Sequence, residues 1–228
     1  MLYVNTLILE ITRRCNMSCE HCLRGNAQNL DMPFEYIDKV LNSVDVINSV
    51  CFTGGEPALN LDAIRYFYKK AEELGKLPMS FEVITNGMVN AEGLAIELLK
   101  AYGKSESKEM CFVAISGDEF HEILPHELSG HILRGLAFYS PVKEGLFTNK
   151  SILIEGRGEE MYESGDWNDT YKFKVKGGDI IPKLDKDTIE TLYVSANGKI
   201  TGNCDLSYNT IDQTVNLTID DLITFSKI

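Results

Sequence analysis

Apolar residues in the first 160 positions of the chain fall into runs whose spacing predicts strands and helices in turn. Short β-branched and apolar runs, typical of buried strands, occupy residues 6–12, 49–53, 81–85, 110–116 and 151–155. Between them, apolar positions recur at helical spacing over residues 34–44, 61–75, 91–102 and 126–138. This alternation predicts an α/β protein with a parallel sheet and helical crossovers.

The number of strands fits both a doubly wound sheet and an incomplete barrel. A full eight-fold barrel takes about 250 residues, and here the alternation stops near residue 157, so any barrel is partial. Beyond it, a hairpin is predicted to turn at Asn197-Gly198, and a short amphipathic helix covers residues 218–226. We therefore expect a core over residues 1–158 and a C-terminal extension over 159–228 that packs on the core.

Composition and charge narrow the class of protein. The chain has 228 residues, of which 44% are hydrophobic and 25% charged, so it can bury a core. Its net charge of -12 disfavours nucleic acid as a partner, since no local basic patch offsets that charge. No basic residue precedes the first apolar run, and no apolar stretch approaches 18 residues. We expect a cytoplasmic protein with no membrane span.

Three of the six cysteines lie close together on the loop that follows the first predicted strand. Cys15, Cys19 and Cys22 fall within eight residues, and thiolates select zinc or iron-sulfur centres. A closed zinc site wants four ligands, and the fourth would have to be His21, between two bound cysteines. Three cysteines on a 4Fe-4S cluster leave one iron open for an external ligand. A zinc knuckle and a reduced thiol cluster remain the alternatives.

The spacing of these cysteines, together with a second motif, resembles a known family. C-x-x-x-C-x-x-C is followed some thirty residues later by Gly54-Gly55-Glu56-Pro57, as in radical S-adenosylmethionine (radical SAM) enzymes. The resemblance implies a partial (β/α)6 TIM-like barrel with one 4Fe-4S cluster and SAM at the C-terminal mouth of the strands. It also implies that the reduced cluster cleaves SAM to a 5′-deoxyadenosyl radical, which abstracts hydrogen from a substrate.

The resemblance also assigns roles to residues of the first two motifs. Cys15, Cys19 and Cys22 would each bind one iron. The backbone of Gly54-Gly55 and the carboxylate of Glu56 would accept hydrogen bonds from the SAM ammonium group. Glycine at these positions permits close backbone approach. Taken alone, Gly-Gly-Glu-Pro is equally an ordinary turn at the end of a strand.

The ends of the later strands carry further candidates for binding SAM. Ser116 and Asp118 match the positions that hold the SAM ribose, although a turn or helix cap also explains Ser-Gly-Asp. Asn86, in Thr-Asn-Gly, matches another SAM contact, and a tight turn explains it almost as well. Arg157 could face the SAM carboxylate. The segment around Arg157 departs from the family pattern, because Ile152 stands where that pattern has glycine.

The C-terminal hairpin resembles a truncated form of the extension found in peptide-modifying radical SAM enzymes. Full extensions carry further cysteines for auxiliary clusters, but none follows Cys204. Cys51 and Cys111 lie on predicted strands and are expected to be core residues. We therefore expect no auxiliary cluster, and Cys204 is either a buried thiol or a group near the substrate.

The sequence leaves several substrate classes open. The hairpin favours a peptide or protein side chain, with a small metabolite or nucleotide, or a glycyl-radical enzyme that needs activation, as alternatives. The resemblance also implies an electron donor such as flavodoxin or ferredoxin. A non-catalytic metal-binding protein is the least favoured class, because it gives the Gly-Gly-Glu and Ser-Gly-Asp segments no purpose.

Overall fold

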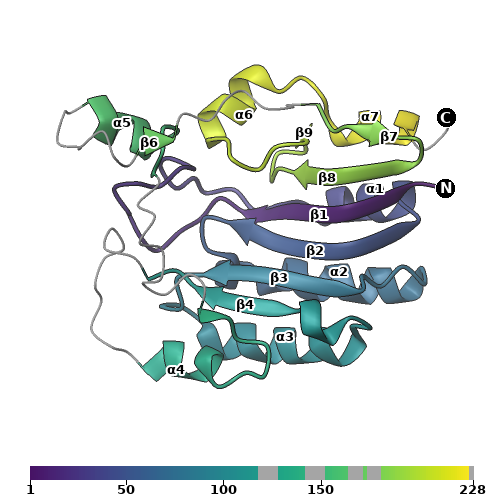
Figure 1. The fold of residues 1–228 in the computed structure, drawn as a ribbon, viewed down its shortest axis with the longest axis horizontal. Helices are drawn as coiled ribbons and strands as arrows, with labels where there is room; N and C mark the ends of the chain where they lie inside the picture. Colours follow the sequence, from purple (N-terminus) through teal and green to yellow (C-terminus); the bar gives the residue numbers. More distant parts are fainter. Residues whose placement is uncertain (118–127, 142–151, 164–171, 174–180, 226–228) are drawn as a thin grey trace.

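The structure, a computed structural model, describes residues 1–117, 128–141, 152–163, 172–173 and 181–225. Its main sheet has seven described strands in the order β4-β3-β2-β1-β8-β7, with β9 paired to β8 (Figure 1). All neighbours from β4 to β8 run parallel, whereas β7 and β9 run antiparallel to β8. The bounds are β1 (Tyr3–Thr12), β2 (Val46–Gly54), β3 (Ser80–Thr85), β4 (Phe112–Ile115), β7 (Leu184–Asp185), β8 (Thr188–Val194) and β9 (Ile200–Thr201).

The helices predicted over residues 34–44, 61–75 and 91–102 are present and provide the crossovers from β1 through β4, and part of the helix predicted over 126–138 is present as residues 128–134. The second of these helices ends at Glu73, and Gly75, with φ +67, lies just beyond it. The α-helices are α1 (Phe34–Ser43), α2 (Leu61–Glu73), α3 (Ala91–Lys104), α4 (Leu128–Arg134), α5 (Arg157–Glu163), α6 (Tyr208–Thr214) and α7 (Ile219–Phe225). Two short 3-10 helices are η1 (Pro57–Leu59) and η2 (Lys108–Met110).

Strand β1 lies in the middle of the sheet and is buried on both faces. Its Leu7 and Leu9 side chains belong to the large core between the sheet and the helices α1, α2 and α3. On the opposite face, Ile8 packs in a smaller cluster with Tyr193, Leu206, Ile211 and Val215. Burial on both faces explains why the sequence of this strand is a continuous apolar run rather than an alternating one.

The predicted C-terminal hairpin is confirmed, and it does more than close the chain. Strands β8 and β9 pair around Asn197-Gly198, where Gly198 has φ +82. In addition, β8 pairs in parallel with β1 along residues 3–9, on the edge opposite β2. The hairpin therefore extends the parallel sheet.

The expectation that residues 151–155 continue this sheet as its fifth strand is wrong. Here β5 (Ile152–Leu153) pairs only with β6 (Lys172–Phe173), in a separate sheet of two strands. The outer edge of β4 is taken instead by residues 138–140, because Val113 donates to the Phe138 carbonyl and accepts from the Ser140 nitrogen. These bonds occupy the groups that a further strand would use.

The α/β class with a parallel sheet and helical crossovers is confirmed, and the sheet is open. Among the described strands, no pairing joins β4 to β7, as a closed barrel would require. The division of the chain at residue 158 stays a prediction. No helix in the described ranges has the length and apolar character needed to cross a membrane.

Candidate functional site

The predicted site residues that the structure describes lie mostly on loops at one edge of the sheet. The cysteine loop follows β1, residues 54–56 end β2 and lead into η1, residues 85–87 follow β3, and Ser116 follows β4. Because these strands are parallel, their C-terminal ends share an edge, where ligand sites of α/β sheets form. Hydrogen bonds between the loops then fix their relative positions.

The three cysteines of the first loop are half-buried thiols held in a turned backbone. Cys22 N donates to the Cys19 carbonyl at 3.1 Å, and Gly25 N donates to the Cys22 carbonyl at 3.0 Å. Burial, together with the smaller effects of the neighbouring Cys22 and Cys15, raises the pKa of Cys19 to about 11. Burial raises the pKa of Cys15 as well. These thiols would ionise at neutral pH only beside a strong positive centre, such as a bound metal.

The three cysteine side chains meet the ligand requirement of an iron-sulfur cluster. In the described ranges, no three His, Cys, Asp or Glu side chains are grouped so that they could hold a single metal ion. An iron-sulfur cluster takes each thiolate on a different iron, so its ligands need not converge on one point. The three cysteines lie within eight residues of one loop, so their thiolates are available to one cluster.

Gly54 and Gly55 bring the end of β2 against the backbone of the cysteine loop. Gly55 N donates to the Thr12 carbonyl at 3.0 Å, and the next nitrogen in the chain donates to the Arg14 carbonyl at 2.8 Å. A Cβ atom on Gly54 would overlap the Thr12 carbonyl oxygen, and one on Gly55 would overlap that of Arg14. We expected these glycines to allow the backbone to approach SAM closely. The structure shows that they are needed for the close approach of this backbone to the cysteine loop.

Glu56 is a buried carboxylate that ties three segments together. Its side chain is 1% exposed. Oε1 accepts from Ala58 N at 3.0 Å and from Thr85 Oγ1 at 2.6 Å, and Oε2 accepts from Asn86 N at 2.7 Å. Burial raises the pKa of Glu56, while these hydrogen bonds lower it in part. The carboxylate thereby fixes η1 and the end of β3 to the end of β2.

Asn86 continues this chain of contacts to the cysteine loop. Its Nδ2 donates to the Asn16 side chain at 2.9 Å, and Asn16 is the residue after Cys15. Its Oδ1 accepts from Met88 N at 3.0 Å, which forms the tight turn considered for Thr-Asn-Gly. Asn86 therefore forms a tight turn and also lies at the candidate site. Its contact with SAM stays a prediction.

Ser116 is held at the same edge by the strand beside it. Its backbone nitrogen donates to the Thr85 carbonyl at 2.8 Å, and the residue is half-buried. Asp118, the other predicted ribose contact, lies outside the described residues. The ribose assignment thus stays a prediction for both.

Arg157 reaches the site from the start of α5. Its backbone nitrogen donates to the Cys22 carbonyl at 3.0 Å. The preceding Gly156 has φ +59, and a Cβ there would overlap the carbonyl oxygens of Cys22 and Leu23. The guanidinium lowers the pKa of Cys19, and its buried Nε has no hydrogen-bond partner among the described residues. An anionic group bound beside the cysteines could accept from this atom.

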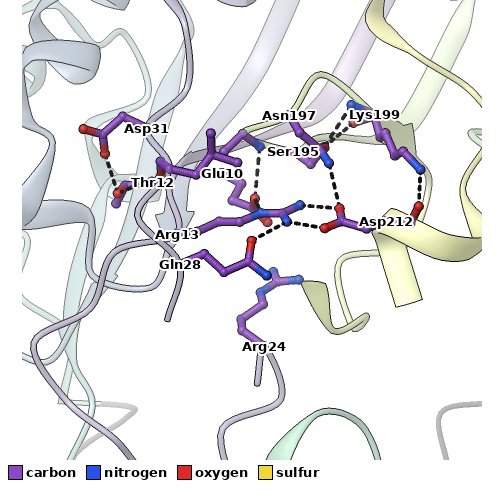
Figure 2. A network of polar contacts seen from close by, with 12 residues as sticks. Glu10, Thr12, Arg13, Arg24, Gln28, Asp31, Ser195, Asn197, Lys199 and Asp212 are labelled. Atoms are coloured by element: carbon purple, nitrogen blue, oxygen red, sulfur yellow. Dashed lines mark hydrogen bonds and ion pairs between the residues drawn. The ribbon is translucent and has the colours of Figure 1, made fainter. Parts of the chain in front are cut away.

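Sequence reasoning missed a buried ionic network that links β1 to the C-terminal segment. Arg13 is 1% exposed and forms ion pairs with Glu10 at 2.6 Å and Asp212 at 2.7 Å (Figure 2). Glu10 also accepts from Ala196 N at 3.0 Å and from the Tyr193 hydroxyl. The signal was present in the sequence, because Glu10 stands inside an apolar strand and a buried charge requires a partner.

A second arginine lies on the other side of the cysteines. Arg24 donates from Nη1 to the Leu206 carbonyl at 2.7 Å, and its guanidinium lies 5.0 Å from the centre of the Tyr193 ring. Arg13, two residues before Cys15, lies 4.6 Å from the centre of the Tyr208 ring. Residues 193–212 therefore hold both ends of the cysteine loop.

The three remaining cysteines lie apart from the loop. Cys111 is buried in the large core, as expected. Cys51 and Cys204 are half-buried and both pack against the smaller cluster around Ile8. Cys51 is thus at the edge of the core rather than deep within it. Burial raises the pKa of Cys51 to about 12.

Comparisons with known proteins show which family the chain resembles. A sequence model described as the Radical SAM superfamily matches residues 9–134. A GTP 3′,8-cyclase of Clostridium botulinum is 30% identical to the chain, over 83% of this chain and 69% of the cyclase. An uncharacterized protein of Methanocaldococcus jannaschii is 31% identical over 52% of this chain, which spans only 41% of that relative.

One solved structure shows similarity of fold. It is anSMEcpe with bound AdoMet and a Cp18Cys peptide, which has a TM-score of 0.50 and 13% identity, over 99% of this chain and 80% of that one. Streptococcus suis SuiB, solved with its precursor peptide SuiA, has a TM-score of 0.44 and 13% identity, over 98% of this chain and 65% of SuiB.

Proposed function

The chain belongs to the radical SAM superfamily, and from this premise we propose that it is an enzyme that holds one 4Fe-4S cluster on Cys15, Cys19 and Cys22. When bound, the cluster supplies an electron that cleaves SAM to a 5′-deoxyadenosyl radical, which abstracts hydrogen from a substrate. The observation that carries this proposal is the bonding of the cysteine loop to the Gly-Gly-Glu segment.

The residues proposed to hold SAM surround the cysteine loop. The backbone of Gly54 and Gly55 lies against that loop, where its polar groups would meet the SAM ammonium. Glu56 Oε2 accepts one bond among the described residues, and a carboxylate oxygen can accept a second. Charge-assisted bonds of this kind are about twice as strong as neutral ones.

The other proposed contacts come from the later loops and from α5. Asn86 is fixed beside the cysteine loop through Asn16. Ser116 ends the next strand, and we propose that it binds the SAM ribose together with Asp118. The unpartnered Nε of Arg157 supports the pairing of this guanidinium with the SAM carboxylate.

The substrate class that we propose is a peptide or protein side chain. It is supported by the C-terminal hairpin, present as β8 and β9, on which the resemblance to peptide-modifying enzymes rests. A nucleotide is the second candidate, because the relative that is 30% identical over most of this chain is a GTP 3′,8-cyclase. We also propose that the enzyme is cytoplasmic and that a flavodoxin or ferredoxin supplies the electron that reduces its cluster.

Anaerobic reconstitution tests the central proposal. About four irons and four sulfides per chain are expected, with 5′-deoxyadenosine formed once a strong reductant and SAM are added. Replacing Cys15, Cys19 and Cys22 together by Ala should abolish iron binding, whereas Cys204→Ala should not. Tightly bound zinc, or SAM binding without 5′-deoxyadenosine despite a working reductant, would place the protein in the non-catalytic class.

Deuterium transfer separates the two substrate classes. The enzyme is incubated with SAM and either fully deuterated GTP or a deuterated peptide digest, and the 5′-deoxyadenosine is weighed by mass spectrometry. A gain of deuterium from the peptides supports the proposal. A gain from GTP alone would replace it with the nucleotide candidate.

A further inference from the structure

The hydroxyl of Tyr208 is a buried polar group that no contact of the described residues uses. Tyr208, the first residue of α6, is 2% exposed. Its hydroxyl has no hydrogen-bond partner in the described part of the chain. Leaving a buried polar group without a hydrogen bond destabilises the fold. Such a group in a native structure needs an explanation, and an absent ligand is one.

The position of Tyr208 indicates which ligand this is. Its backbone nitrogen donates to the Arg24 carbonyl at 3.2 Å, so it is attached two residues beyond Cys22. Its ring lies under the guanidinium of Arg13, two residues before Cys15. The side chain is thus wedged between the two ends of the cysteine loop.

Arg24 provides a second, independent observation at the same place. It is 9% exposed, yet in the described ranges it forms no ion pair with a carboxylate. Buried charges are normally paired, because desolvation strongly disfavours an isolated one. Arg13, in contrast, is paired with two carboxylates. Arg24 is stabilised by the Leu206 carbonyl, the Tyr193 ring and the charge of nearby Glu10, but no described carboxylate lies within ion-pair distance of it, and an anionic centre at Cys22 would add a closer counter-charge.

Resting on the proposed function, we propose that Tyr208 is a positioning residue of the cluster, whose unpartnered hydroxyl would donate a hydrogen bond to a sulfide of the cluster bound at Cys22. Arg24 supplies the compensating positive charge. Reduction adds negative charge to a cluster, so a hydrogen bond to sulfur and a nearby cation both raise its reduction potential. The C-terminal segment, beyond the matched residues 9–134, would then help to set the potential at which SAM cleavage begins.

Tyr208→Phe tests this with the loss of a single oxygen atom. The midpoint potential of the reconstituted cluster is measured by redox titration followed by electron paramagnetic resonance. The variant should bind as much iron as the parent and have a more negative potential. Tyr68→Phe is the matched control. The Tyr68 hydroxyl on α2 is also buried without a described partner, but the Tyr68 side chain packs in the large core and not against the cysteine loop. Its potential should equal that of the parent.

Two further measurements distinguish a bond to the cluster from a structural role. Electron-nuclear double resonance of the reduced parent should show an exchangeable proton coupling that Tyr208→Phe lacks. In the iron-free protein, the same variant should unfold at the same urea concentration as the parent or a higher one. The cluster of Arg24→Lys should have a midpoint potential close to that of the parent. The cluster of Arg24→Gln should have a more negative one.

The outcomes separate this inference from the proposed function. If the parent binds no four-iron cluster, both fail. If it binds one and Tyr208→Phe has the potential of Tyr68→Phe, the inference alone is overturned. A loss of stability in iron-free Tyr208→Phe would also overturn it, because the hydroxyl would then have a partner in the chain itself.

Discussion

The backbone nitrogen of Asn86 donates a 2.7 Å hydrogen bond to the carboxylate of Glu56, so the ends of two neighbouring strands share one buried acceptor. The family motif that contains Glu56 therefore has a structural role before any ligand binds. Its glutamate organises the loops, and its glycines allow the loops to meet. This relationship leads to predictions that can be tested on the iron-free protein.

Glu56→Gln should destabilise the fold by about 1–3 kcal/mol, because the new amide presents a donor where Glu56 accepts from protein donors. Urea unfolding of the iron-free protein measures the change. Glu106→Gln, the same substitution at an exposed position between α3 and η2, should have no measurable effect. Equal stabilities of the two variants would show that the Glu56 contacts contribute little.

Gly55→Ala should destabilise the protein by about 1–3 kcal/mol, the usual cost of overpacking, because its Cβ would overlap the Arg14 carbonyl. It should also reduce iron incorporation, since the cysteine loop has to shift. Gly103→Ala has open space on α3 and should gain about 0.5–1 kcal/mol. Unfolding and iron analysis of both variants provide the comparison, and normal iron binding in Gly55→Ala would contradict the steric argument.

Acid should weaken the attachment of α6 to the cysteine loop. Burial alone would raise the pKa of Asp212, but its hydrogen bonds and charge interaction with Arg13 hold it below the ordinary 3.8. A carboxylate with a depressed folded-state pKa stabilises the fold above its unfolded pKa and loses that contribution as the pH falls through the folded value. Stability should therefore decrease below about pH 4.

Asp212→Asn should show a smaller decrease over that acid range when stability is measured by urea unfolding at each pH. Asp187→Asn makes the same change of charge on an exposed turn and should retain the parent's decrease. A parallel pH profile for Asp212→Asn and the parent would mean that the ion pair does not contribute.

Cys51 should resist alkylation in the folded protein. Burial raises its pKa to about 12, so only about one thiol in ten thousand is ionised at pH 8. Iodoacetamide labelling followed by peptide mass spectrometry measures the rate, and in urea Cys51 should react as an ordinary thiol. Equal rates in the folded and unfolded protein would contradict the assigned burial.

Sequence patterns predicted the elements that depend on neighbouring residues. The first four strands and the helices α1, α2 and α3 follow from local apolar spacing, and the cysteine and Gly-Gly-Glu loops follow because each lies directly after a strand. The purpose of the glycines was only partly predicted. The Thr12 and Arg14 carbonyls that they contact become neighbours only when β1 and β2 pair.

The features that were missed depend on residues far apart in the chain. Nothing local to residues 188–194 indicates that this strand pairs with β1. Likewise, the apolar pattern of residues 151–155 does not indicate that residues 138–140 already occupy the edge of β4. In the same way, Arg13 lies near the start of the sequence, whereas its partners Asp212 and Tyr208 lie near the end. Apolar periodicity carries no information about such pairs.

The place of β8 beside β1 has a consequence for how the protein is made. Glu10 and Tyr193, which bond across these two strands, are 183 positions apart. During synthesis, β1 leaves the ribosome early and can pair with β2 soon afterwards, but its other edge stays open until residues 188–194 have been made. An unpaired edge can pair with other chains, so slow translation or truncation before residue 188 should favour aggregation.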